Sequence, residues 1–310
     1  MIRKQAIQDD RMRTAAGGEP PVAVRIVSPS GVIDPAFIDA AADRLRNEGF
    51  AVSVDGNAGA VAGRYAGSRE LRIAALQAAM DDEELDVILC SRGGYGLVQI
   101  VDSLDFTRFV EKPKWLVGFS DITVLHNALS KYGIPSIHGP MVRHLAGHPA
   151  DSYSSAQLLR MLRSGLPTYR IAAHPLNRQG SSRGRLVGGN LSVLAGLRGT
   201  PYDLDYAGAI LFIEDIAEQA YHIDRMLQNL RLGGVFAQLA GLIVGHFTDC
   251  ADDASMGRSL PELIRDALEG TCFPVCFGFP AGHEDQNYPL VLGREIGLTV
   301  TGHETVVDFS

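Results

Sequence analysis

The sequence contains few cysteines and no long apolar run. Its four cysteines lack the CxxC spacing of metal or redox sites, and a chain of 310 residues does not need disulfides to hold its fold. No stretch reaches the roughly 20 apolar residues of a membrane span. The first 20 residues are charged throughout and lack the apolar core of a signal peptide, and we expect them to form a loose leader. A cytoplasmic protein without membrane contact is therefore expected.

Positive charge is also scarce. The chain has 28 Lys and Arg against 36 Asp and Glu, a net charge of −8, which opposes a broad phosphate-binding surface. We therefore expect no nucleic-acid partner. With 46% hydrophobic and 21% charged residues, the composition is that of a globular protein long enough for about two domains.

Short apolar runs alternate with helical periods from Val22 onward, as in a parallel sheet with crossover helices. The expected strands are 22–27, 51–55, 86–90 and 115–119, with helices after Asp34 and Ser68. We predict an N-terminal α/β domain over residues 21–165, built on an open, mostly parallel sheet with flanking helices, in the Rossmann-like manner. Residues 166–183 gather Gly, Pro, Ser and Arg and are expected to form a linker. Residues 184–310 are expected to form a β-rich C-terminal domain with a few helices.

Two loops follow strands of the predicted first sheet, at the edge where open α/β sheets bind ligands. One is the glycine loop "SRGGYG" at 91–96, and the other begins at Ser120 after "WLVGF". A serine there can cap the following helix, because its hydroxyl accepts a backbone N–H. It can equally be a nucleophile raised on a tight strand-to-helix turn. The residues alone leave both readings open.

A serine nucleophile needs a base and usually a carboxylate that orients the base. Glu214 ends the strand-like "AILFIE", and His283 lies in the Gly- and Pro-rich "GFPAGH". Glu214 can instead be an acid that favours the N-terminus of the following helix. His283 is one of nine histidines, so its residue type alone does not single it out.

The sequence indicates neither a cofactor nor a metal. The glycine loop has Gln99 where a dinucleotide fingerprint needs its third glycine. His144 and His148 are four residues apart, but Gly147 and Pro149 interrupt the helix that would align them as zinc ligands. Cys90 is expected to end a buried strand rather than to react.

Seven motifs in this order resemble those of the LD-carboxypeptidases, the serine peptidase family of muramoyltetrapeptide carboxypeptidase, to which the microcin C immunity peptidases are related. They are "SRGGYG" (91–96), "GFSDIT" (118–123), "HGP" (138–140), "GGNLSVLAGLRGTPY" (188–202), "LFIEDI" (211–216), "IDRMLQNLRLGG" (223–234) and "GFPAGH" (278–283). The resemblance covers nearly all of the chain from Val22 onward.

This resemblance implies a catalytic triad of Ser120, Glu214 and His283. It also implies an oxyanion hole formed by the N–H of Asp121 and an amide of Gly93 or Gly94. A carboxypeptidase must bind a free carboxylate, and we expect Arg92, beside the glycine loop, to do so. The alternative for Arg92 is a surface position or a structural ion pair.

The implied activity is that of a cytoplasmic serine carboxypeptidase, commonly a homodimer, that releases the terminal D-alanine of a murein tetrapeptide during cell-wall recycling. One alternative is a related hydrolase of a peptidyl-nucleotide antibiotic, as in microcin C immunity. Another is a ligand-binding protein without turnover.

Overall fold

The computed structural model describes residues 20–149, 151–250 and 253–310. The chain divides into two compact units, one running to Gly165 and including Tyr288–Leu290, the other comprising Leu166–Asn287 and Val291–Ser310. Residues 1–19 of the expected leader lie outside the described residues. Within the described ranges, no helix is both long and apolar enough to span a membrane.

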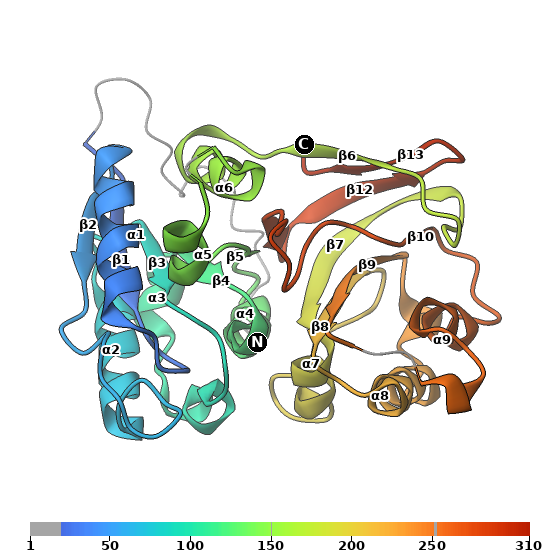
Figure 1. The fold of residues 1–310 in the computed structure, drawn as a ribbon, viewed down its shortest axis with the longest axis horizontal. Helices are drawn as coiled ribbons and strands as arrows, with labels where there is room; N and C mark the ends of the chain where they lie inside the picture. The colour runs from blue at the N-terminus through green and yellow to red at the C-terminus, as the bar shows by residue number, and fades with distance from the viewer. Residues whose placement is uncertain (1–19, 150, 251–252) are drawn as a thin grey trace. The chain divides into compact units, whose positions relative to one another are not determined.

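The first unit is built on strands β1 to β5 (Figure 1), which belong to a six-stranded sheet in the order β11-β5-β4-β3-β1-β2. Its strands are β1 (Ala23–Val27), β2 (Ala51–Val54), β3 (Val87–Cys90), β4 (Trp115–Gly118), β5 (Ser136–His138) and β11 (Leu290–Leu292). Strands β1 to β5 pair in parallel. Its helices are α1 (Pro35–Asn47), α2 (Arg69–Asp81), α3 (Thr107–Glu111), α4 (Thr123–Ser130), α5 (Val142–Gly147) and α6 (Tyr153–Ser164). The predicted open parallel sheet with flanking helices is confirmed.

Burial explains why these strands and helices form. Every residue of β3 and β4 is buried, as expected for central parallel strands covered on both faces. Helix α1 begins where the Asp34 side chain accepts the Ala36 N–H, with Pro35 in the first turn. Its buried face carries Ile38 and Leu45, with Ala41 and Ala42 between them.

The second unit is built on a seven-stranded sheet in the order β10-β9-β8-β7-β12-β13-β6. Its strands are β6 (Thr168–Ala172), β7 (Gly180–Asn190), β8 (Ile210–Ile216), β9 (Gly241–Thr248), β10 (Val275–Cys276), β12 (Glu295–Val300) and β13 (Glu304–Asp308). The half from β10 to β7 is parallel, and the half from β7 to β6 is antiparallel. In Figure 1, helices α7 (Leu191–Leu197), α8 (Ala220–Leu232) and α9 (Leu260–Ala267) gather at the parallel half. The predicted β-rich second half with few helices is confirmed.

The segment 166–183, expected to be a linker, contains β6 and the first residues of β7. Strand β6 lies at the edge of the sheet and pairs only with β13. Tyr169 is its one fully buried residue, with its ring packed edge-on against Phe279 and Phe309. A strand of five residues with a single fully buried side chain gives only a weak signal in the sequence, especially between Gly- and Pro-containing segments.

The core of the second unit fixes the ends of β7, β8 and β9. It gathers side chains from these strands and from α7, α8 and α9: Val187, Leu191, Leu194, Leu211, Ile213, Ile223, Leu227, Leu230, Leu242, Val244, Leu260 and Ile264. All are buried, and the strand residues alternate toward the helices. The polar residues that follow at the carboxyl ends of these strands are therefore held on a rigid frame.

Candidate active site

Ser120 lies on a sharp turn between β4 and α4 in the first unit. Its φ of 65° is in the left-handed region, which a residue with a side chain occupies only at a cost in strain. The residue that caps α4 is Ile122, so the interpretation of Ser120 as the helix cap is wrong. A strained serine between a parallel strand and a helix is instead the arrangement of a nucleophile elbow.

The glycine loop lies directly against Ser120. A Cβ atom placed on Gly93 would lie 2.7 Å from Ser120 Cβ and 2.9 Å from its Oγ. Gly93 is itself held in place, because its carbonyl accepts the Gly31 N–H at 3.0 Å. Only glycine allows this loop to approach the serine so closely, and the structure therefore brings the predicted Gly93 and Ser120 together.

The side chain of Asp121 ties three segments together around the serine. It is 3% exposed, and its Oδ2 accepts the Ser30 hydroxyl at 2.5 Å and the Leu97 N–H at 3.0 Å. Burial raises the pKa of Asp121, although these two donors and the charge of Arg72 oppose the rise. The carboxylate thus joins the turn after β1, the end of the glycine loop and the elbow.

Arg72 of α2 makes a second link between the same loops. Its Nη1 donates to the carbonyls of Pro29 at 3.2 Å and Gly96 at 3.0 Å. Neither Ser30 nor Arg72 was predicted from the sequence. An arginine on the apolar face of α2, in line with Leu76, was the available signal, because a buried guanidinium needs acceptors.

His126 supports the elbow from within α4. Burial lowers the pKa of His126 to about 4, so its ring is neutral near pH 7. Its Nε2 lies 2.9 Å from the Gly118 carbonyl, to which it can only donate, so Nδ1 accepts the Ser136 hydroxyl at 2.8 Å. A neutral histidine in this bonding pattern is structural, and it fixes the end of β4 just before Ser120.

Arg92 is half-buried beside the glycine loop, and its Nη1 donates to the Val32 carbonyl at 2.7 Å. This bond orients the side chain. Its expected role in binding a substrate carboxylate stays a prediction, as do the oxyanion-hole roles of Asp121, Gly93 and Gly94.

Glu214 and His283 meet in the second unit. His283 Nδ1–H donates to Glu214 Oε2 at 2.6 Å. Glu214 lies inside β8, and α8 begins only at Ala220 after the cap Gln219, so the alternative of a helix-starting acid is wrong. The carboxyl is fully buried, and its Oε1 has no hydrogen-bond partner among the described residues. A buried carboxylate with one oxygen unbonded is stabilised by a positive charge beside it, and protonated His283 can supply that charge.

The surroundings of His283 favour its charged form. Burial alone lowers the pKa of His283, but the charge and hydrogen bond of Glu214, with a smaller effect of Asp215, raise it above its ordinary value of 6.5. The neighbouring His246 behaves in the opposite way, because burial lowers its pKa against the attraction of Glu284 and Glu214. His283 is therefore the histidine here that is suited to take up and hold a proton.

The loop that carries His283 is fixed by close packing. Gly282 has a φ of +131°, and a Cβ on it would lie 3.1 Å from Glu214 Oε2. Its N–H donates to Oδ1 of the buried Asn287 at 3.0 Å. These contacts set the histidine against the carboxylate, and the sequence analysis identified neither residue.

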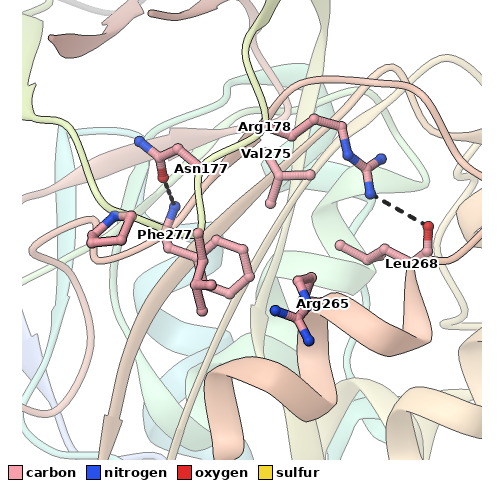
Figure 2. Close-up of a pocket in the computed structure, with 8 residues that line it drawn as sticks. Asn177, Arg178, Arg265, Leu268, Val275 and Phe277 are labelled. Carbon is pink, nitrogen blue, oxygen red and sulfur yellow. Dashed lines mark hydrogen bonds between the residues drawn. The ribbon is translucent and has the colours of Figure 1, made fainter. Parts of the chain in front are cut away.

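A cavity of about 350 Å³ lies elsewhere in the second unit, and Figure 2 shows its lining. Arg178 borders it, but its guanidinium donates to the carbonyls of Leu268 and Thr271, which ties the start of β7 to the end of α9. Arg265 is paired with Asp266. None of the predicted site residues lines this cavity, and both of its arginines have partners within the second unit.

Clusters of His, Cys and carboxylate side chains could bind a metal ion, and an ionised cysteine could act as a nucleophile. Over 20–149, 151–250 and 253–310, no group of three or more His, Cys, Asp or Glu is placed to hold a metal ion. Cys90 ends β3 and is buried, which confirms the prediction of a buried strand end. Burial raises the pKa of its thiol, which leaves it protonated and unreactive.

Comparison with known proteins gives two family matches. Residues 24–139 match the LD-carboxypeptidase N-terminal domain, and residues 183–298 match the LD-carboxypeptidase C-terminal domain. A probable murein peptide carboxypeptidase of Bacillus subtilis is 33% identical over 92% of this chain and 91% of its own length. The murein tetrapeptide carboxypeptidase of Pseudomonas aeruginosa is 32% identical over 87% and 91%. The crystal structure of muramoyltetrapeptide carboxypeptidase from Oxalobacter formigenes superimposes with a TM-score of 0.86 at 27% identity, covering 93% of this chain and 99% of that one.

Proposed function

This chain belongs to the LD-carboxypeptidase family, and we propose that it is a serine peptidase that releases the terminal D-alanine of a murein tetrapeptide. The observation that carries the proposal is the 2.6 Å hydrogen bond between His283 and the buried Glu214. The strained turn at Ser120 supports it, because a nucleophile completes this acid–base pair.

In the proposed reaction, Ser120 Oγ attacks the carbonyl of the bond before the terminal D-alanine, and His283 Nε2 accepts the hydroxyl proton. Glu214 holds the imidazole by Nδ1 and stabilises its charged form. His283 then returns the proton to the leaving amine, which leaves an acyl group on Ser120. Water, activated by the same histidine, hydrolyses this ester and regenerates the serine. The reaction requires the first unit to supply the serine and the second unit to supply the base to one substrate.

We assign the developing oxyanion to backbone donors at the elbow, the N–H of Asp121 and an N–H of Gly93 or Gly94. Such a donor contributes roughly 3 to 4 kcal/mol to the stability of the transition state. The links made by Asp121 and Arg72 support this assignment, because they hold the glycine loop and the elbow in one arrangement before substrate binds. We assign the terminal carboxylate of the substrate to Arg92.

The test is to incubate the protein with a murein tetrapeptide ending in D-alanine, and with a matched peptide ending in L-alanine, and to identify released amino acids by mass spectrometry. We expect D-alanine from the first peptide and nearly no release from the second. Cleavage of a peptidyl-nucleotide in place of the tetrapeptide would contradict the proposed substrate. The homodimer and the cytoplasmic location implied by the family resemblance stay predictions, and sedimentation analysis tests the first.

A further inference from the structure

A buried polar cluster lies beside the Glu214–His283 pair and takes no part in the proposed reaction. Its centre is Asp215, which is 1% exposed. Asp215 Oδ1 accepts from Asn190 Nδ2 at 2.8 Å, and Oδ2 accepts from the Ser192 N–H at 2.9 Å. The Ile216 N–H adds a third bond to Oδ1 at 2.9 Å. A carboxylate that is so fully bonded and buried is held in one position.

The cluster ties the end of β8 to the junction of β7 and α7. Asn190 ends β7 and caps α7, because its Oδ1 accepts the Val193 N–H at 3.2 Å. The pairing of β8 with β9 shifts register between Ile213 and Asp215, so on that side Glu214 has no partner in the ladder. On the other side Glu214 pairs with Asn190, the last residue of β7. From the next position along the strand, the Asp215 side chain adds its bond to the same Asn190 and so reinforces the end of β8.

Resting on the proposed triad, we propose that Asp215 is a positioning residue: anchored to Asn190 and to the first turn of α7, it fixes the end of β8 so that Glu214 stays against His283, and its negative charge favours the imidazolium. Successive side chains of a strand point to opposite faces, so Asp215 can bond to α7 while Glu214 faces the histidine.

The electrostatics agree with this role. Burial and then the charge of Glu214 raise the pKa of Asp215 to about 6, although its hydrogen-bond donors oppose the rise. Cys250 lies near Asp215 and Glu218, and its thiol is protonated because burial raises its pKa. The charges of Glu214 and Asp215 both raise the pKa of His283. The adjacent His246 of β9 adds no positive charge, because burial lowers its pKa. Asp215 therefore adds to a field that Glu214 dominates.

The experiment is an NMR titration of histidine ring signals in the full-length protein, comparing wild type with Asp215→Asn. Asp203→Asn is the matched control, because Asp203 accepts bonds from Arg198 and the Gly199 N–H in the same unit but is not among the charges acting on His283. We expect the pKa of His283 to fall toward 6.5 in Asp215→Asn and to stay at the wild-type value in Asp203→Asn.

Turnover gives the second measurement. We expect Asp215→Asn to lower kcat by about 10- to 100-fold, the effect that residues supporting directly acting groups have at metal sites, with little change in KM. The acid limb of kcat/KM should move to lower pH together with the pKa of His283. An unchanged His283 titration and unchanged kcat would overturn the proposal.

The wild-type protein gives a test that does not depend on folding of the variant. The carboxyl carbon of Asp215 should titrate near pH 6, and the His283 ring signals should respond in the same pH range; independent titrations would overturn the proposal. The ring titrations need no turnover, so they separate this inference from the triad. If Asp215→Asn keeps the wild-type kcat and His283 titration while Ser120→Ala is inactive, only the role of Asp215 is rejected. If Ser120→Ala still turns over substrate, the triad is rejected.

Discussion

Gly93 shows at the scale of one residue how little room the proposed nucleophile has. We expect Gly93→Ala to lower kcat by at least 100-fold with little change in melting temperature, because the new methyl group would lie 2.7 Å from Ser120 Cβ and displace the serine. Gly147→Ala in the same unit is the matched control, since among the described residues its added methyl group would have no atom within 4 Å apart from its chain neighbours and the backbone of its own helix. Steady-state kinetics give kcat and KM for both variants. Equal kcat values would show that the glycine loop can move away from the added methyl group without displacing Ser120.

Glu214→Gln tests the charge of the buried carboxylate. An amide can still accept the hydrogen bond of His283, but it cannot stabilise the imidazolium, so we expect kcat to fall about 10⁴-fold with a small change in KM. Measurements of kcat and KM should be made beside a thermal melt. A variant that retains kcat would mean that the pair with His283 has only a structural role.

Residue types and their neighbours offered Ser120, Glu214 and His283 only as candidates, because each ends a strand-like run or lies in a glycine-rich loop. The family resemblance joined them into a triad. The residues that hold them were not found. Asp121 was considered only for its backbone N–H, whereas its side chain bonds to Ser30, 91 positions earlier in the chain. Partners so distant in sequence leave no local pattern, and only the folded chain brings them together.

At the scale of the elements, the end of β8 carries an ionisable group whose folded-state pKa is raised from 3.8 to about 6. A raised carboxyl pKa stabilises the fold fully below pH 3.8, and this contribution is lost as the pH rises through about 6. The rise corresponds to about 3 kcal/mol. We therefore expect the free energy of unfolding of wild type, relative to Asp215→Asn, to fall by up to about this amount between pH 4 and pH 7.

Urea denaturation of both proteins across this pH range measures the difference, and groups that the two proteins share cancel in it. Asp203→Asn serves again as the control, because no such pH dependence is expected there. A wild-type minus Asp215→Asn difference that is constant with pH would show that folding does not raise the pKa of Asp215.

Strands β1 to β4 could be predicted from the sequence, and in β3 and β4 burial on both faces gives continuous apolar runs. Strand β6 could not, since its pairing with β13 joins residues more than 130 positions apart and buries only Tyr169 completely. Its Gly- and Pro-containing surroundings have the composition of a linker. Here pairing distant in sequence, rather than local propensity, determines the structure.

At the scale of the whole molecule, the account assigns the chemistry to side chains and backbone amides alone. We expect activity to be unchanged by EDTA, because in the part of the chain that the structure describes no cluster of His, Cys, Asp or Glu suits a metal ion. Assays before and after dialysis against the chelator test this expectation. Loss of activity that added zinc restores would require a different mechanism.

The central claim is that Ser120 is the nucleophile, and the most direct test is the rate of D-alanine release from a murein tetrapeptide by Ser120→Ala and by wild type. Because removal of one half-buried hydroxyl costs little packing, both proteins should give the same circular dichroism spectrum and similar melting temperatures. The account predicts a loss of about 10⁶ in kcat for the variant, the size found when a triad serine is removed. Release by Ser120→Ala within tenfold of the wild-type rate would contradict it.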